Sequence, residues 1–183
     1  MPMRLKQGFI DDKGVGHIPL TRGKETLVSA HKFHSLSQFN WYANRNPSSG
    51  RWCAQRQVRL PNGKQTAQLM ARVIMGVTDS TIEVDHKDRD SLNNRTENLR
   101  VATHRQNLCN VGLRATSTSG RIGVTRHQGG WVARISVNGK RLHIGCFATR
   151  EAAALAYNKA ALKYHGEFAV LNTLPLEQLK QAA

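Results

Sequence analysis

The sequence predicts an α+β protein made of two small units, and three features of the chain support this. Residues 82–107 run from an apolar stretch through a polar loop to a second apolar stretch and a helix start. Residues 122–147 contain three strand patterns, and a helical pattern follows them. Residues 110–119 are rich in Ser, Thr and Gly, which is typical of linkers. We therefore expect a first unit over 1–109, a linker over 110–119, a second unit over 120–174 and a tail over 175–183.

The part of the chain before residue 82 is expected to mix hairpins with short helices. Arg22-Gly-Lys24 lies between two strand patterns and predicts a hairpin, and Pro61-Asn-Gly63 is a strong turn signal. Gly76 is expected to end a helix, because glycine is common just past helix ends. The expected strands cover residues 18–21, 25–30, 41–43 and 51–60, and the expected helices are a short one capped by Ser29 and one over Thr66–Met75.

The second unit is expected to be a three-stranded antiparallel sheet packed on one helix. Its strand patterns cover residues 122–127, 131–137 and 140–147. Asn138-Gly139 between the last two strands is a strong hairpin signal. Thr149 is expected to cap the helix that follows, since a threonine side chain can accept a hydrogen bond from the first turn.

Alternation along these strands predicts one apolar face and one basic face. The helix carries apolar residues at helical spacing, so it can cover the apolar face. The basic face is then left to enter a DNA major groove, with an ordinary solvated face as the alternative. The apolar face should carry Trp131, Ala133, Ile135, Val137, Leu142 and Ile144, the other face Val132, Arg134, Ser136, Arg141 and His143, and the helix stripe Ala153, Tyr157, Ala160, Ala161 and Tyr164.

The charge of the chain indicates a polyanionic partner. Lys and Arg number 27 against 12 Asp and Glu, which gives a formal net charge of +15. Cationic contacts with phosphates release counterions from nucleic acid, which makes binding more favourable, so DNA is the expected partner. A membrane surface is the competing interpretation, but we find no long apolar span and no signal-peptide pattern. The scattered cysteines Cys53, Cys109 and Cys146 form no Cys-x-x-Cys pair and do not suggest a zinc site.

Three kinds of polar group are expected to converge within residues 84–107. Asp85 and His86 end the first apolar run, and Asn107 lies in the first turns of the following helix. The pattern Thr103-His-Arg-Gln106 is a capping box that predicts the start of this helix. A carboxylate and an amide oxygen suit a hard metal ion, and an imidazole beside them suits a base.

Four short groups of residues in this segment form one pattern: Asp85-His86, Asn94-Arg95, Asn98-Leu99-Arg100 and Gln106-Asn107. The pattern closely resembles the HNH endonucleases carried by bacteriophages and mobile introns. Residues 18–24 and 72–76 also look like the phage subgroup. The resemblance implies a ββα-metal (His-Me finger) core over residues 82–109. It also implies a metal-dependent DNA endonuclease of the homing or phage DNA-processing type.

The resemblance further implies a role for each matching residue. His86 would be the general base that takes a proton from water, and Asn98 would fix the loop through backbone hydrogen bonds. Asp85 and Asn107 would hold one divalent metal ion, with Mg²⁺ expected and Mn²⁺ as the alternative. One catalytic set per chain would nick one strand and leave 5′-phosphate and 3′-hydroxyl ends. The candidate phosphate contacts in this unit are Arg72, Arg95 and Arg100.

Residues 120–172, from Ser-Gly-Arg-Ile-Gly-Val124 to Gly-Glu-Phe-Ala-Val-Leu-Asn172, resemble the AP-two (ethylene-response-factor) DNA-binding domain. The resemblance implies that one sheet face meets double-stranded DNA. Several residues differ in type from the plant pattern, so the sequence preference of that domain does not carry over. The residues at the DNA-facing positions are Thr125, His127, Arg134, Ser136, Arg141 and His143.

Ala71 departs from the phage pattern, which often has His between the Met and Arg of the preceding helix. Two functions therefore stay open: an HNH endonuclease positioned by its second unit, and a catalytically impaired DNA-binding or regulatory protein. The expected location is the cytoplasm, that of the host cell if a phage encodes the chain. The sequence leaves open whether the protein is a monomer or a homodimer.

Overall fold

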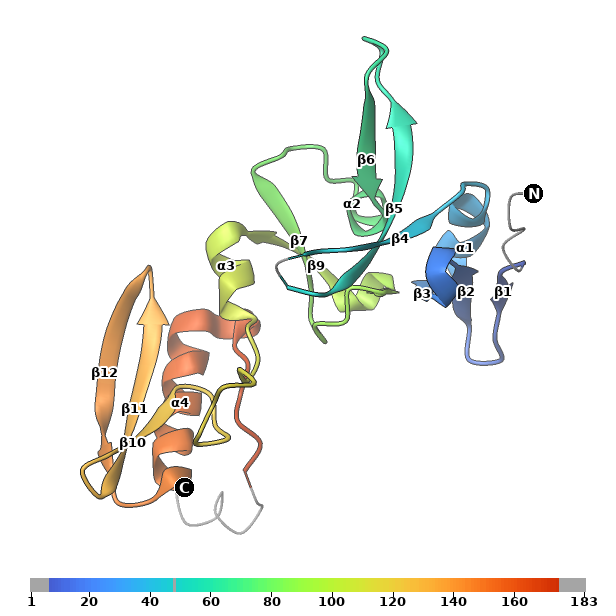
Figure 1. Ribbon diagram of the computed structural model, residues 1–183. Coiled ribbons are helices and arrows are strands. Elements are labelled where there is room, and N and C mark those ends of the chain that lie inside the picture. Colours follow the sequence, from blue (N-terminus) through green and yellow to red (C-terminus); the bar gives the residue numbers. More distant parts are fainter. Residues whose placement is uncertain (1–6, 48, 175–183) are drawn as a thin grey trace. The chain divides into compact units, whose positions relative to one another are not determined.

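The computed structural model describes residues 7–47 and 49–174 (Figure 1). The chain divides into two compact units, Met1–His104 and Arg105–Ala183. This division falls at the start of α3 (His104–Cys109), ahead of the boundary expected at residue 109. The expected tail over 175–183 lies outside the described residues. Within the described ranges, none of the helices is both long enough and apolar enough to cross a membrane.

A four-stranded sheet joins the beginning of the first unit to its polar loop. Its order is β1, β2, β3 and β8. β2 and β3 pair antiparallel around a short 3-10 turn, η1, as the hairpin prediction requires. β8 pairs parallel with β3, although the two strands are far apart in sequence. The bounds are Phe9–Ile10 for β1, Val15–Pro19 for β2, Thr21–Gly23 for η1, Glu25–Ser29 for β3 and Asn93–Asn94 for β8.

A second sheet has the order β4 (Tyr42–Arg45), β5 (Trp52–Arg59) and β6 (Gln65–Leu69), and its β5–β6 hairpin projects as an arm in Figure 1. The single helix predicted over Thr66–Met75 is therefore wrong in its first half. The turn before β6 folds these residues back onto β5, and ladder pairing overrides their helical spacing. Only α2 (Met70–Met75) is helical, and Gly76 ends it at φ 64° as expected.

α1 (Ala30–Ser37) buries Phe33 and Leu36, but Ser29, its predicted cap, does not cap it through its side chain. The Ser29 hydroxyl instead donates to Glu97 Oε2 at 2.9 Å and accepts from the Thr96 amide at 2.8 Å. These two contacts tie the helix start to the polar loop. The hydrogen-bond partners of Ser29 are therefore residues far away in sequence, which the residues next to Ser29 do not predict.

The third sheet of the first unit carries the Asp-His pair. β7 (Ile82–His86) pairs antiparallel with β9 (Leu99–Thr103), and the loop between them contains β8 and the 3-10 turn η2 (Thr96–Asn98). β9 continues directly into α3. α2 packs against both β7 and β9, and one hydrophobic core serves the whole unit. The fully buried side chains of this core include Leu20, Val28, Trp41 and Met70.

The second unit is one three-stranded sheet in the order β10, β11, β12 with one long helix packed on it. The Thr149 hydroxyl accepts from the Ala152 amide at 3.1 Å, so the predicted cap is confirmed. Ala153, Tyr157 and Ala161 are buried as expected, but Tyr164 is 46% exposed. The bounds are Val124–His127 for β10, Gly130–Val137 for β11, Lys140–Phe147 for β12, Arg150–His165 for α4 and Gly166–Phe168 for the 3-10 turn η3.

Two residues of this sheet differ in exposure from the rest of their face. Val132 pairs with Thr125 and so lies on the basic face as predicted, but it is only 2% exposed, because it lies on the central strand between Thr125 and Cys146. Leu142 pairs with Ile135 and so lies on the apolar face as predicted, but it is 37% exposed on an edge strand. The register also shifts between Ala133 and Arg134, an irregularity of the bulge type that strand periodicity cannot foresee.

Candidate active site and nucleic-acid interface

The pairing of β7 with β9 positions Asp85 and His86 at the end of a strand. Asp85 lies opposite Arg100, and His86 lies opposite Leu99. Asp85 is 5% exposed, whereas His86 is half-buried. Two chemically active side chains are therefore held by a backbone ladder and not by a free loop, which fixes their positions before any substrate arrives.

The Asp85 carboxylate forms a buried ion pair. Arg100 Nη2 and Nε lie 2.6 and 2.8 Å from the same oxygen, Oδ2 of Asp85. The side chain of Arg100 is 11% exposed. A buried carboxylate needs such a partner, because an isolated charge away from water is strongly unfavourable. Arg100, expected at a phosphate, thus neutralises the candidate metal ligand in the DNA-free chain.

His86 is held in a state suited to accepting a proton. Burial of the imidazole lowers the pKa of His86 below its usual value, and the hydrogen bond with Asn94 and the nearby aspartates oppose this without reversing it. The ring is therefore neutral at physiological pH. His86 Nε2 lies 3.1 Å from Asn94 Oδ1. Asn94 belongs to the quoted pattern, but sequence reasoning gave it no role of its own.

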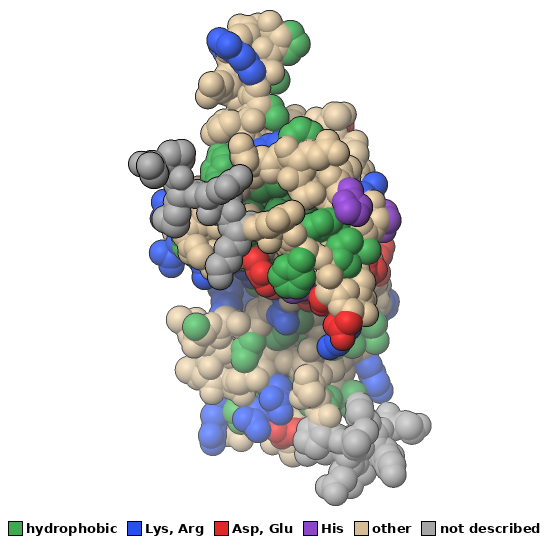
Figure 2. Space-filling model, turned by 90° about the vertical axis from the view of Figure 1, so that its right-hand side faces the viewer, with side chains coloured by type: hydrophobic (Ala, Val, Ile, Leu, Met, Phe, Trp, Pro, Cys, Tyr) green, Lys and Arg blue, Asp and Glu red, His purple; other side chains and the backbone are tan. Residues whose placement is uncertain are grey.

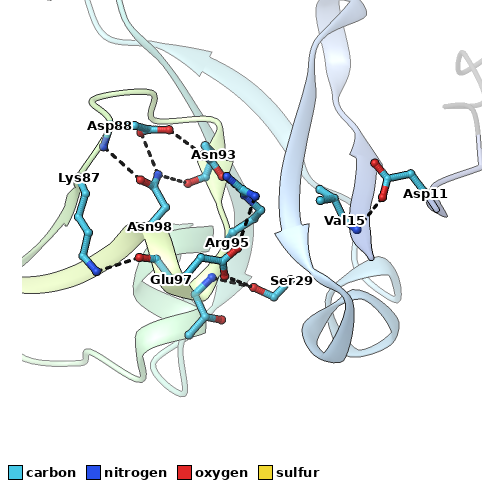
Figure 3. A network of polar contacts seen from close by, with 10 residues as sticks. Asp11, Val15, Ser29, Lys87, Asp88, Asn93, Arg95, Glu97 and Asn98 are labelled. Atoms are coloured by element: carbon cyan, nitrogen blue, oxygen red, sulfur yellow. Dashed lines mark hydrogen bonds and ion pairs between the residues drawn. The ribbon is translucent and has the colours of Figure 1, made fainter. Parts of the chain in front are cut away.

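Asn98 ties the polar loop to itself (Figure 3). Its Nδ2 donates to Asp88 Oδ1 at 2.9 Å and to the Asn93 carbonyl oxygen at 2.7 Å. Its Oδ1 accepts from the Asp88 amide at 3.1 Å, and its backbone carbonyl accepts from the Lys87 amide at 2.9 Å. Asn98 is 7% exposed. Two of these side-chain contacts are to backbone atoms of residues that follow His86 along the chain.

Replacing Asn98 with Ala should destabilise the loop measurably. The change leaves the buried Asn93 carbonyl without this partner, at a cost of about 1–3 kcal/mol, and also removes the acceptor of the Asp88 amide. Urea denaturation of the full chain measures the loss in free energy of unfolding. Asn44→Ala, an exposed asparagine on β4, is the control and should change stability by less than about 0.5 kcal/mol. Equal stability of the two variants would contradict this account of Asn98.

Asn107 lies on α3, three residues into the second compact unit. Its meeting with Asp85 at one metal ion stays a prediction. In residues 7–47 and 49–174, no group of three or more His, Cys, Asp or Glu side chains is arranged to hold a metal. The predicted donor set of one carboxylate and one amide is of a different kind, so this finding does not bear on it.

Two of the candidate phosphate contacts hold backbone or loop groups. Arg72 donates from Nη1 to the Ile82 carbonyl at 2.6 Å and from Nη2 to the Asp79 carbonyl at 2.7 Å, which fixes the entry to β7. Arg95 donates from Nε to Asn93 Oδ1 at 2.9 Å and forms an ion pair with Glu97. Their proposed contacts with DNA stay predictions.

The six candidate DNA-facing residues of the second unit share one face of its sheet. Directly paired residues of an antiparallel sheet point the same way. The pairs Arg134–His143 and Ser136–Arg141 therefore lie on one side, the side away from the residues that pack on α4. By the same register that side carries Thr125, His127, Arg134, Ser136, Arg141 and His143, all exposed except the half-buried Arg134.

Basic side chains are spread widely over the protein. Figure 2 shows Lys and Arg dispersed over the face drawn, with the few Asp and Glu side chains in small groups. The formal net charge of +15 reflects this excess. A surface of this kind attracts phosphate groups through long-range electrostatics.

Residues 68–109, which contain the Asp-His pair and the polar loop, match the family described as HNH endonuclease, a class of nucleases. A protein of Acanthamoeba polyphaga mimivirus, described as an uncharacterized HNH endonuclease, is similar over almost the whole chain. It is 33% identical over 171 residues, which span 91% of this chain and 85% of the viral protein. The chain therefore belongs to the HNH endonuclease family.

The C-terminal part is similar to plant transcription factors. One AP2-like ethylene-responsive transcription factor of Arabidopsis thaliana is 39% identical over 90 residues, which span 47% of this chain and 18% of the plant protein. A second from the same plant is 54% identical over 54 residues, 27% of this chain and 9% of the plant protein. The similarity to AP2-like domains expected from the sequence is thus found in this part of the chain.

Proposed function

We propose that the chain is a metal-dependent DNA endonuclease that nicks one strand and is positioned by its second unit. The observation that carries this is the neutral, half-buried His86 held next to Asp85 at the end of β7, in a chain of the HNH family. An imidazole fixed next to a carboxylate can accept a proton while the carboxylate attracts a cation.

His86 would act as the general base. A neutral imidazole accepts a proton from the attacking water, and its lowered pKa keeps it neutral near pH 7. Asn98 would maintain the loop geometry on which the position of His86 depends. Arg95 and Arg100 would supply positive charge to the phosphate. Hydrolysis in which the 3′ oxygen is the leaving group gives 5′-phosphate and 3′-hydroxyl ends.

Asp85 and Asn107 would hold one divalent ion, for which Mg²⁺ is the expected choice and Mn²⁺ the alternative. Their oxygen atoms suit a hard cation. Arg100 Nη2 and Nε both contact Oδ2 of Asp85, so an ion held by this carboxylate would lie close to the guanidinium. When bound, the ion would stabilise negative charge on the phosphate and on the leaving oxygen. The neighbouring guanidinium weakens cation binding, so we expect the DNA phosphate to complete the site.

A plasmid assay tests this proposal. Supercoiled plasmid should become open circle with the protein and Mg²⁺, but not when a chelator replaces the metal. DNA ligase alone should reseal the product, because ligation requires a 5′-phosphate next to a 3′-hydroxyl. Metal-independent nicking, or nicks that ligase leaves open, would contradict the proposed reaction.

A second candidate is a DNA-binding or regulatory protein with an impaired nuclease site. Ala71 favours it, since its methyl group can bind neither metal nor phosphate. Ala71 lies on α2, which packs against β7 and β9, and it is 8% exposed. A protein that binds plasmid tightly but leaves it supercoiled in Mg²⁺ and in Mn²⁺ would favour this candidate over the nuclease.

The second unit is proposed to hold double-stranded DNA on the sheet face opposite α4. Replacing Arg134 and Arg141 together with Ala should weaken binding and lower the salt dependence of log Kd by about one phosphate contact for each residue. Fluorescence anisotropy with duplex DNA at several salt concentrations measures both quantities.

A matched control removes the same charge from the other side of this unit. Lys159 and Lys163 are exposed residues of α4, so replacing both with Ala also lowers the net charge by two. The control should change the salt dependence much less than the sheet variant. If the two double variants lose affinity equally, overall charge and not the sheet face determines binding.

A further inference from the structure

A chain of buried polar side chains behind His86 is not used by the proposed reaction. His86 Nε2 lies 3.1 Å from Asn94 Oδ1, and Asn94 Nδ2 donates to Thr26 Oγ1 at 2.8 Å. Thr26 Oγ1 in turn donates to the Leu92 carbonyl oxygen at 2.7 Å. Thr26 is 0% exposed and Asn94 is 1% exposed. At this burial, water cannot readily replace a lost partner, so the direction of each hydrogen bond has chemical consequences.

The direction is set at Thr26. A hydroxyl has one proton, and two acceptors are within reach of Oγ1: the Leu92 carbonyl oxygen at 2.7 Å and Met70 Sδ at 3.9 Å. The carbonyl oxygen is closer and is the stronger acceptor. Once the hydroxyl proton is used there, Thr26 Oγ1 can only accept from Asn94. The amide of Asn94 must therefore turn its NH₂ group to Thr26 and its oxygen to His86.

The reversed amide would form fewer hydrogen bonds. Its oxygen would accept the hydrogen bond of the Thr26 hydroxyl in place of the Leu92 carbonyl oxygen, and its NH₂ group would donate to the His86 ring. That arrangement keeps two hydrogen bonds where the first has three. Facing an oxygen that can only accept, His86 Nε2 must carry the ring proton. The lone pair then lies on Nδ1.

We propose that Asn94 and Thr26 are positioning residues that hold the imidazole of His86 in the tautomer with its proton on Nε2. The inference rests on the proposed role of His86 as the base. Thr26 lies on β3 and Asn94 on β8, and these two strands pair directly in parallel. The N-terminal hairpin thereby sets the protonation of a histidine that comes 60 residues later in the chain.

The first test reads the tautomer without any cleavage assay. In full-length protein with ¹⁵N-labelled histidine, long-range proton–nitrogen correlation spectra at about pH 8 distinguish the protonated from the unprotonated ring nitrogen of a neutral imidazole. His86 is identified among the 8 histidines by the signals missing from His86→Gln. The wild-type ring should have its proton on Nε2. A proton on Nδ1 would overturn the inference, even if the protein nicks DNA as proposed.

Variants then test the chain of contacts. Thr26→Val keeps the shape but removes the hydroxyl, so it should shift His86 towards the Nδ1-protonated form. Its single-turnover cleavage rate should fall about 10- to 100-fold with little change in DNA affinity. Thr26→Ser returns the hydroxyl and should restore both the tautomer and the rate. Unchanged tautomer and rate in Thr26→Val would contradict the proposal.

A matched control removes a buried hydroxyl that has no role in the chain. Thr96 Oγ1 is buried without a hydrogen-bond partner in the described structure. Thr96→Val should therefore leave the tautomer of His86 and the cleavage rate unchanged.

If Thr26→Val does not fold, Asn94→Asp provides a second test of the tautomer. A carboxylate only accepts hydrogen bonds, so His86 should keep its proton on Nε2 in that variant, and a shift to Nδ1 would count against the inference.

Discussion

His86→Ala should reduce plasmid cleavage by about 10²- to 10⁴-fold, the range expected for loss of a general base. The imidazole is the neutral base that the proposed site places beside the candidate metal ligand Asp85, and Ala cannot accept a proton. DNA affinity should stay within about twofold, because the candidate DNA-binding residues are unchanged. Quantified nicking and fluorescence anisotropy on the same preparation measure the two effects separately.

An exposed histidine provides the control for this substitution. His34 lies on the exposed side of α1, so His34→Ala should leave cleavage at the wild-type rate. Full cleavage by His86→Ala would refute the assignment of the base. A parallel loss of affinity would indicate that His86 contributes to holding the DNA and not to the chemical step.

Arg100→Ala should be the most destabilising of the proposed substitutions. It leaves Asp85 as a buried carboxylate without the guanidinium that lies 2.6 Å from it. Breaking one side of a buried ion pair typically costs about 3–5 kcal/mol. Urea denaturation of the full chain should detect the loss in the transition of the first unit. Arg150→Ala, which breaks a more exposed pair with Glu151, should cost less than about 1 kcal/mol.

A double substitution separates the structural role of this pair from its chemical role. Asp85→Asn combined with Arg100→Met removes both charges at similar volume, so stability should recover most of the loss. Cleavage should stay abolished, since the carboxylate proposed to hold the metal is gone. A double variant as unstable as Arg100→Ala would show that the loss arises from packing and not from the unpaired charge.

Local signals were sufficient for much of the fold. The hairpin at β2–β3, the three strands of the second unit and the Thr149 cap all depend on short-range turn and capping chemistry. The Asp85–His86 pair was predicted at the end of a strand, where it lies. These features could be predicted because each is determined by residues a few positions apart.

The remaining features depend on partners far away in sequence. Residues 66–69 form a strand because β5 pairs with them. The Ser29 side chain hydrogen-bonds to Thr96 and Glu97 and does not cap its own helix. The ion pair of Arg100 with Asp85 likewise requires the register of β7 against β9. Periodicity within a window cannot reveal such choices, since they are settled by tertiary contacts.

The parallel pairing of β8 with β3 has a consequence for how this nuclease can be divided or transplanted. A fragment cut to residues 82–109 would keep the Asp-His pair but lose the strand on which the loop docks and the core beneath it. The smallest portable catalytic module is therefore not the recognisable motif. We expect that a transplanted site would need the N-terminal hairpin β2–β3 together with residues 82–109.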